Sequence, residues 1–229
     1  MFLLYQNVAD TLAQAAAVVG QEAESVNLFE LLVKGGVLMI PLALLLILAI
    51  YFFIERFLAI KKASHIDPNF MNIVKDHIVT GNVKAARSIT KNTNHPIARI
   101  IDKGIQRLGK PIEAIERSME NVGRLEMYNL ERNISVLSMI AGMAPMFGFL
   151  GTIVGMIQMF YEINTSGRFE LNTIAGGIYV KMITSAAGLM IGLTAYVFYS
   201  YLHAQIDKIA NRMEVASADF LDILQEPQR

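Results

Sequence analysis

The sequence predicts an all-α membrane protein, with three transmembrane helices and long cytoplasmic helical extensions. Three stretches, 35–54, 134–161 and 182–202, are apolar and contain no charged residue. Each is long enough to cross the hydrocarbon core of a bilayer, which takes roughly 20 helical residues. Hydrophobic residues make up 54% of the chain and charged residues 17%, a composition typical of integral membrane proteins.

Positive charge is distributed unevenly along the chain and predicts its orientation. Of the 20 Lys and Arg residues, 14 lie within 56–132 and three more follow residue 202. The positive-inside rule therefore places these two regions in the cytoplasm, and the N-terminus and the connection between the last two spans outside. The expected segments are an N-terminal amphipathic segment (1–34), the first span (35–55), a cytoplasmic helical domain (56–133), the second span (134–161), a short outer loop (162–177), the third span (178–203) and a cytoplasmic C-terminal helix (204–229).

The N-terminal segment has apolar residues at helical spacing, which predicts a short amphipathic helix on the outer membrane surface. A frayed terminus is the alternative. After the first span, Arg56, Lys61 and Lys62 are expected to be interface residues, and the two lysines to snorkel toward anionic headgroups.

The cytoplasmic part is predicted to be helical throughout. Asp67 and Pro68 begin a helix that ends near Gly81, and Asn82 caps the next one. A third helix is expected over 96–108, and Pro111 begins a fourth. Because no proline or cap follows until Pro145, we expect this fourth helix to run unbroken into the second span. Residues 204–224 have apolar side chains at spacings of three and four, which predicts a helix that continues the third span.

No catalytic or cofactor chemistry is indicated. The sequence contains no cysteine and none of the nucleotide-binding, zinc-protease or nucleophile-elbow motifs, so we expect neither an enzyme nor a bound metal or cofactor. The basic residues are diluted by carboxylates, which argues against nucleic-acid binding. The histidines do not have the spacing of metal ligands, and we expect them at surface or boundary positions: His65, His77, His95 and His203.

Small residues recur at helical intervals in the last two spans and predict close helix packing. The packing residues are Pro145, Gly148, Gly151, Gly155, Gly188 and Gly192. Helix packing alone is one interpretation of this pattern, and a functional seam is the other.

Polar side chains lie beside these glycines and are the candidate functional groups of the spans: Thr152, Thr184, Ser185 and Lys181. Thr152 lies four residues after Gly148 and Ser185 three before Gly188, so both hydroxyls are expected at a close-packed seam. Each could bond a carbonyl of its own helix, or interact with a titrating group of another chain. Lys181 could snorkel to the outer headgroups or face a lumen.

The segments APMFGFLGTIVGM (144–156) and GIYVKMITSAAGLMIG (177–192) resemble the two pore-helix motifs of the MotA/TolQ/ExbB proton-channel family. The segments ERFLAIKKA (55–63) and GNVKAAR (81–87) are similar to the same family, so the likeness covers the chain from about Phe29. Three spans with a large loop after the first resemble the ExbB and TolQ branch rather than the four-span MotA type.

The resemblance implies a homopentameric ring in the bacterial inner membrane, with a periplasmic N-terminus and a cytoplasmic C-terminus. The ring would enclose two single-span helices of an ExbD-like partner, each with an intramembrane aspartate. Protonation of that aspartate would drive movement passed on by a TonB-like protein, energising transport across the outer membrane. Thr152 and Ser185 match the family's two lumen-facing hydroxyl positions, with Ser185 in place of the usual threonine. The resemblance makes Thr184 and Lys181 further candidate pore-lining residues.

One departure from the family is expected to matter. Many ExbB and TolQ sequences have a glutamate in the third span, and the resemblance places Val180 there, so no span of this chain contains a carboxylate. The titrating acid must then come from the partner. Other interpretations are a TolQ-like role in envelope integrity, a self-contained carrier that binds solute at Lys181, Thr184 and Ser185, and a membrane scaffold. Paired hydroxyls could serve either H⁺ or Na⁺.

Overall fold

The computed structural model describes residues 36–167 and 171–225, and every regular element in these ranges is a helix. The predicted N-terminal amphipathic segment lies outside the described residues. The helices are α3 (Met39–Ser64), α4 (Phe70–Val79), α5 (Val83–Asn92), α6 (Pro96–Ile105), α7 (Ile112–Glu131), α8 (Ile134–Ser166) and α9 (Leu171–Gln225).

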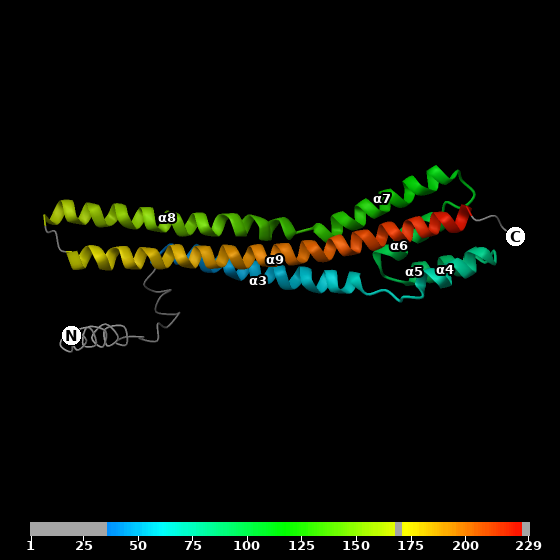
Figure 1. Cartoon of the computed structure of the whole chain (residues 1–229), viewed down its shortest axis with the longest axis horizontal. Helices are drawn as coiled ribbons and strands as arrows, with labels where there is room; N and C mark the ends of the chain where they lie inside the picture. Colours follow the sequence, from blue (N-terminus) through cyan, green and yellow to red (C-terminus); the bar gives the residue numbers. More distant parts are fainter. Residues whose placement is uncertain (1–35, 168–170, 226–229) are drawn as a thin grey trace, which may run out of the picture.

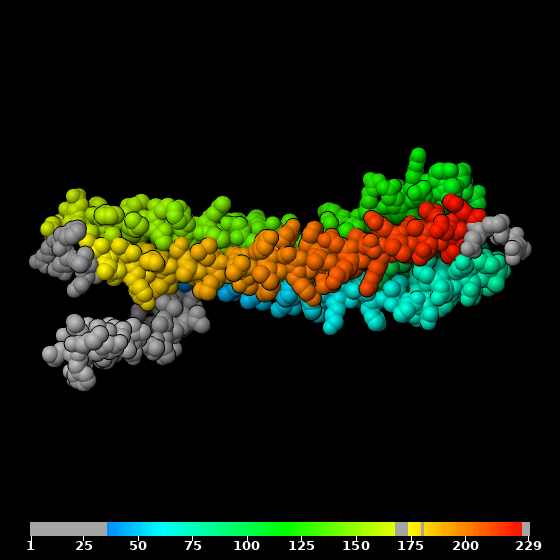
Figure 2. Space-filling view, viewed as in Figure 1, coloured from blue at the N-terminus to red at the C-terminus, as the bar shows by residue number. Residues whose placement is uncertain are grey.

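The molecule is a long rod built around α9 (Figure 1). α8 runs antiparallel beside the first half of α9, and α3 packs along both. The helices α4 to α7 gather around the second half of α9 and form what we call the polar bundle, which Figure 2 shows as the thicker end of the rod. With 55 residues, α9 is about 80 Å long, far more than a bilayer requires.

The three predicted spans are confirmed as helices. α3, α8 and α9 are each long and apolar enough to cross a membrane. In the most apolar 18-residue stretch of each helix, only 17%, 28% and 18% is buried within the chain. Most of their apolar surface is therefore left for lipid or for other chains. The outer loop expected over 162–177 is instead mostly helical, because α8 continues to Ser166 and α9 begins at Leu171.

The helix starts expected in the polar bundle are largely confirmed. The Asn82 side chain accepts a hydrogen bond from the Ala85 amide at 3.3 Å and caps α5. Gly81, with φ of +74°, ends the preceding turn. α4 begins a little later than expected, at Phe70, after a turn in which the Asp67 carboxylate accepts from the Asn69 amide at 2.9 Å.

The second half of α9 continues the third span as a helix, as its apolar spacing predicted, and it is the core of the polar bundle. Its inward side chains Ile206, Ile209, Met213 and Phe220 are all buried. Gly104 of α6 lets α9 approach closely, because a Cβ at this position would lie 2.6 Å from a ring carbon of Phe220.

The expectation of one unbroken helix from Ile112 into the second span is wrong. α7 ends at Glu131, and Asn133 has a left-handed backbone with φ of +64°, so α8 starts as a separate helix. Asparagine tolerates this conformation better than most residues. A contact with α3 also stabilises this break between the helices, since the side-chain amide of Asn133 donates a hydrogen bond to the Glu55 carboxylate at 3.4 Å.

Arg56 occupies the same junction. Its side chain is buried, ion-pairs with Glu55, and donates from Nη1 to the Asn129 carbonyl at 3.3 Å. That carbonyl belongs to the last turn of α7, where helix carbonyls lack partners. Lys61 and Lys62 are exposed in the last turn of α3, where positive charge complements the helix dipole.

His95 does not have the surface or boundary position that we expected for the histidines, because its side chain is buried. Its Nδ1 accepts from the Ile97 amide at 3.2 Å and caps α6. Burial lowers the pKa of this ring; the Ala63 carbonyl works against that effect, and the Arg99 and Arg212 cations add to it. Nε2 makes no hydrogen bond of good geometry within the described residues, so nothing compensates fully for a buried charge.

We predict that His95→Asn flattens the pH dependence of stability. The unfolded chain takes up a proton near the usual histidine pKa of about 6.5, whereas the folded chain resists it. The folded state therefore loses stability as pH falls below about 6.5, until the lowered folded pKa is passed. Asparagine keeps a capping group without titrating.

The measurement is thermal unfolding of the detergent-solubilised protein between about pH 7.5 and 5. His65→Asn, at an exposed histidine, is the matched control and should keep the wild-type slope. An unchanged slope in His95→Asn would show that His95 does not set this dependence.

Candidate functional site

α8 and α9 meet backbone to backbone through their glycines. A Cβ added at Gly188 would lie 2.6 Å from the Ala144 carbonyl oxygen and 2.8 Å from the Gly148 Cα. A Cβ at Gly148 would in turn lie 3.1 Å from the Ser185 carbonyl oxygen. No side chain fits between the helices here, so glycine sets their separation.

The seam continues on both sides of this contact. Gly192 accommodates the ring of Pro145, whose Cδ and Cγ would lie 2.7 Å from an added Cβ. Gly151 accommodates Thr184, whose Cγ2 would also lie 2.7 Å away. The structure thus places all the predicted packing residues at one seam: Pro145, Gly148, Gly151, Gly155, Gly188 and Gly192.

The hydroxyls are arranged differently from our expectation. Thr184 lies inside the seam, where it packs against Gly151, and is 1% exposed. Thr152 and Ser185, expected in the seam, instead border it and are half-buried. The cause is helical phase, the angular position of each residue around its helix. Gly151 and Thr184 face one another, so the residues that follow them are rotated away from the contact by about 100°.

Thr152 and Ser185 lie on the same side of the helix pair. Thr152 directly follows Gly151, and Ser185 directly follows Thr184. Each of these one-residue steps is a rotation of about 100° around its helix. Because α8 and α9 are antiparallel, the two rotations have opposite senses when both helices are viewed from one end. Both hydroxyls therefore come to one side of the pair.

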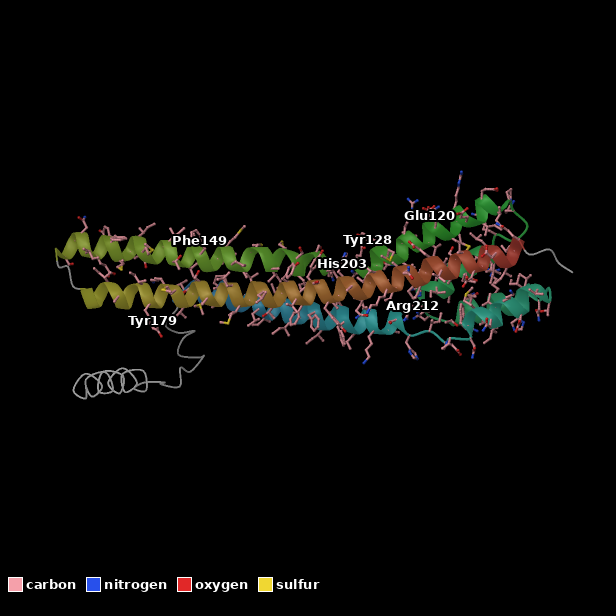
Figure 3. All side chains as sticks on the ribbon, in the orientation of Figure 1. Glu120, Tyr128, Phe149, Tyr179, His203 and Arg212 are labelled. Carbon is pink, nitrogen blue, oxygen red and sulfur yellow. The ribbon has the colours of Figure 1, made fainter. Side chains whose placement is uncertain are left out.

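That side faces away from α3. α3 contacts α9 through Phe53, whose ring stacks on Phe198 at a centroid distance of 4.0 Å, and through Phe57 beside Tyr201. At about 100° per residue, Phe198 and Tyr201 lie roughly 140° and 160° around α9 from Ser185. The surface with the two hydroxyls, which we call the hydroxyl face, is therefore not covered by the first span. Figure 3 labels two exposed side chains of the pair, Phe149 of α8, which precedes Thr152 by three residues and so shares its side, and Tyr179 of α9.

The two hydroxyls differ in their hydrogen bonds. Thr152 Oγ1 donates to the Phe149 carbonyl at 2.7 Å, which is the local alternative considered above. No hydrogen bond reaches the Ser185 hydroxyl within 36–167 and 171–225. Thr152 therefore offers only acceptor lone pairs to a neighbour, whereas Ser185 can donate or accept.

Lys181 completes the hydroxyl face. Its aliphatic stem lies against Gly155, where a Cβ would collide with it, and the residue is half-buried. It precedes Ser185 by four residues and so shares its side of α9. The nearest charged residues along the chain are Glu170 and Asp207. In the described parts of the chain, no group of three or more His, Cys, Asp or Glu residues could hold a metal.

We predict that Gly188→Ala destabilises the α8–α9 pair by about 1 to 3 kcal/mol, the usual cost of overpacking. The added methyl would meet backbone atoms, which cannot move aside without separating the helices. Unfolding of the purified protein by heat or denaturant measures the effect.

Gly176→Ala is the matched control, because nothing lies within 4 Å of a Cβ there. It should be neutral or slightly stabilising, as alanine favours helix over glycine. Equal stability of the two variants would contradict the close backbone contact.

Residues 92–215 match the MotA/TolQ/ExbB proton channel family. The chain is 31% identical over 180 residues to the putative biopolymer transport protein ExbB-like 1 of Synechocystis, covering 77% of this chain and 70% of that protein. It is 27% identical over 191 residues to the putative ExbB homolog of Methanothermobacter thermautotrophicus, covering 82% and 67% respectively.

A Tol-Pal system protein TolQ, from Pseudomonas aeruginosa, is 26% identical over 113 residues, 49% of each chain. The matched region contains α6 to α8 and most of α9, including the whole seam and the hydroxyl face. This chain belongs to the MotA/TolQ/ExbB proton channel family.

Proposed function

We propose that this chain is an ExbB-like subunit of a motor driven by the ion-motive force in the bacterial inner membrane. A homopentamer would surround an ExbD-like single-span partner, and a TonB-like protein would transmit the movement to transport across the outer membrane. The supporting observation is that Thr152 and Ser185 lie on one uncovered side of a tightly joined helix pair. The proposed orientation is a periplasmic N-terminus and a cytoplasmic polar bundle.

The polar hydroxyl face supports a ring. A hydroxyl or ammonium directed at acyl chains is costly, because lipid offers no hydrogen bonds. Several copies with this face turned inward would remove Thr152, Ser185 and Lys181 from lipid and gather them around a central space. α3 would then lie on the outside of the ring, in contact with lipid. The number five follows from the family resemblance.

The hydrogen bonding of the two hydroxyls suits a partner carboxyl group. Thr152 presents lone pairs, which accept from a protonated acid but cannot donate to a carboxylate. Ser185 can serve both forms. One charge that crosses 100 mV releases about 2.3 kcal/mol, enough to shift a two-state equilibrium by roughly fiftyfold.

The acid that titrates is proposed to belong to the partner, because the spans of this chain contain no carboxylate. We place the Lys181 ammonium at the pore side, one turn from Ser185. There it would pair with the partner's carboxylate, and its positive charge would oppose the entry of other cations into the pore.

A TolQ-like role in envelope integrity is the second candidate, since relatives named TolQ match about half of the chain. A self-contained carrier or a scaffold is the remaining alternative. Copurification distinguishes them. A motor subunit should bring down a single-span protein with an intramembrane aspartate, whereas a carrier should bind solute without one.

We predict that the double variant Thr152→Ala with Ser185→Ala abolishes TonB-dependent uptake in cells and proton flux in proteoliposomes with the partner. Both hydroxyls of the hydroxyl face are removed, while the seam is unchanged, so the oligomer should still assemble. Uptake of a labelled substrate and the oligomer's size are the two measurements.

Thr194→Ala is the matched control. Thr194 also donates to a carbonyl of its own helix, at 2.8 Å from Met190, but it lies half a turn around α9 from Ser185. It should retain uptake. Normal uptake by the double variant, or equal loss in Thr194→Ala, would remove the pore assignment.

A further inference from the structure

The polar bundle contains a groove that the ion pathway does not use. It lies between α7 and the last part of α9, has a volume of about 560 Å³, and is also lined by Ile100 of α6. Figure 1 shows α7 running at an angle to α9 along this region. Glu120 and Tyr128, labelled in Figure 3, lie along its α7 edge.

The floor of the groove is apolar and rich in methionine. It includes Met119, Met127, Met213 and Leu221, together with the small side chains of α9. Methionine is flexible and polarisable, so such a floor adapts to varied apolar side chains. Tyr128 beside it is 71% exposed, although large aromatic residues usually gain from burial.

The rim of the groove is acidic. Four carboxylates line it, Glu116, Glu120, Glu131 and Glu214, against the single cation Arg124. Arg124 is already paired with Glu120 at 2.6 Å. The residues that line the groove therefore have an excess of negative charge.

We propose that this groove binds an amphipathic helix of another protein, with its apolar face on the methionine floor and Lys or Arg side chains against the rim. Apolar grooves flanked by carboxylates recognise cationic amphipathic helices by this combination of burial and charge complementarity. Acidic or uncharged helices would leave the rim carboxylates desolvated without partners.

The N-terminal segment of this chain does not match this occupant, because residues 1–35 contain four carboxylates and one lysine, the same sign of charge as the rim. The proposal concerns a surface far from the seam, and it is independent of the ion pathway.

The test uses the full chain in nanodiscs of zwitterionic phosphatidylcholine, with ¹³C-methyl methionine. The probe is a synthetic amphipathic helix of leucine and lysine, and empty nanodiscs give the background. We expect saturable shifts at Met119, Met127 and Met213, while Met146 and Met190, exposed on the spans, stay unchanged. A scrambled peptide of equal composition should not saturate these sites.

Rim variants test the charge. The triple variant Glu116→Gln, Glu131→Gln and Glu214→Gln should weaken binding about tenfold, since each exposed charge contact contributes up to about 1 kcal/mol. It should also reduce the salt dependence. Glu113→Gln, an exposed position on α7 outside the groove, is the matched control and should bind as the wild type does.

Three results would overturn the proposal. The first is the absence of saturable methionine shifts, and the second is equal binding of a peptide with glutamine in place of lysine. The third is cross-linking between copies through Met127→Cys without peptide, which would show that a second copy of this chain fills the groove.

Discussion

The backbone contact between α8 and α9 fixes the rest of the membrane part. At Gly148 and Gly188 the helices are so close that a single added methyl would meet main-chain atoms. Glycine is the one residue that permits this approach, and dispersion between the two backbones then holds the pair together in lipid. The contact also fixes helical phase, which decides which side chains enter the seam and which border it.

Phase explains how three polar residues within five positions of α9 take different roles. Thr184 fills the space above Gly151, Ser185 turns to the hydroxyl face, and Lys181 lays its stem over Gly155. At the other end of the spans, Glu55 and Arg56 of α3 hold the junction of α7 and α8. The polar bundle is thus joined to the membrane helices through α9 and through this charged junction.

The sequence predicted the features that depend on local pattern. Spans, caps and the buried stripe at Ile206 and Phe220 follow from hydrophobic length and periodicity, which act within a few turns of one helix. The break at Asn133 was not predictable, because its left-handed backbone is held by contacts with Glu55, 78 residues away. Burial of Arg56 and His95 likewise depends on neighbours that no local pattern reveals.

The central claim is that the glycine seam turns Thr152 and Ser185 to the same side, and cross-linking within one chain tests it most directly. The chain has no cysteine, so Thr152→Cys with Ser185→Cys can be treated with a short bifunctional thiol reagent and then cut at a protease site engineered between α8 and α9. The account predicts that the two fragments stay joined, and that they separate for Leu150→Cys with Ser185→Cys, because the exposed Leu150 lies about 160° around α8 from Thr152. Separation of the first pair, or joining of both pairs alike, would contradict it.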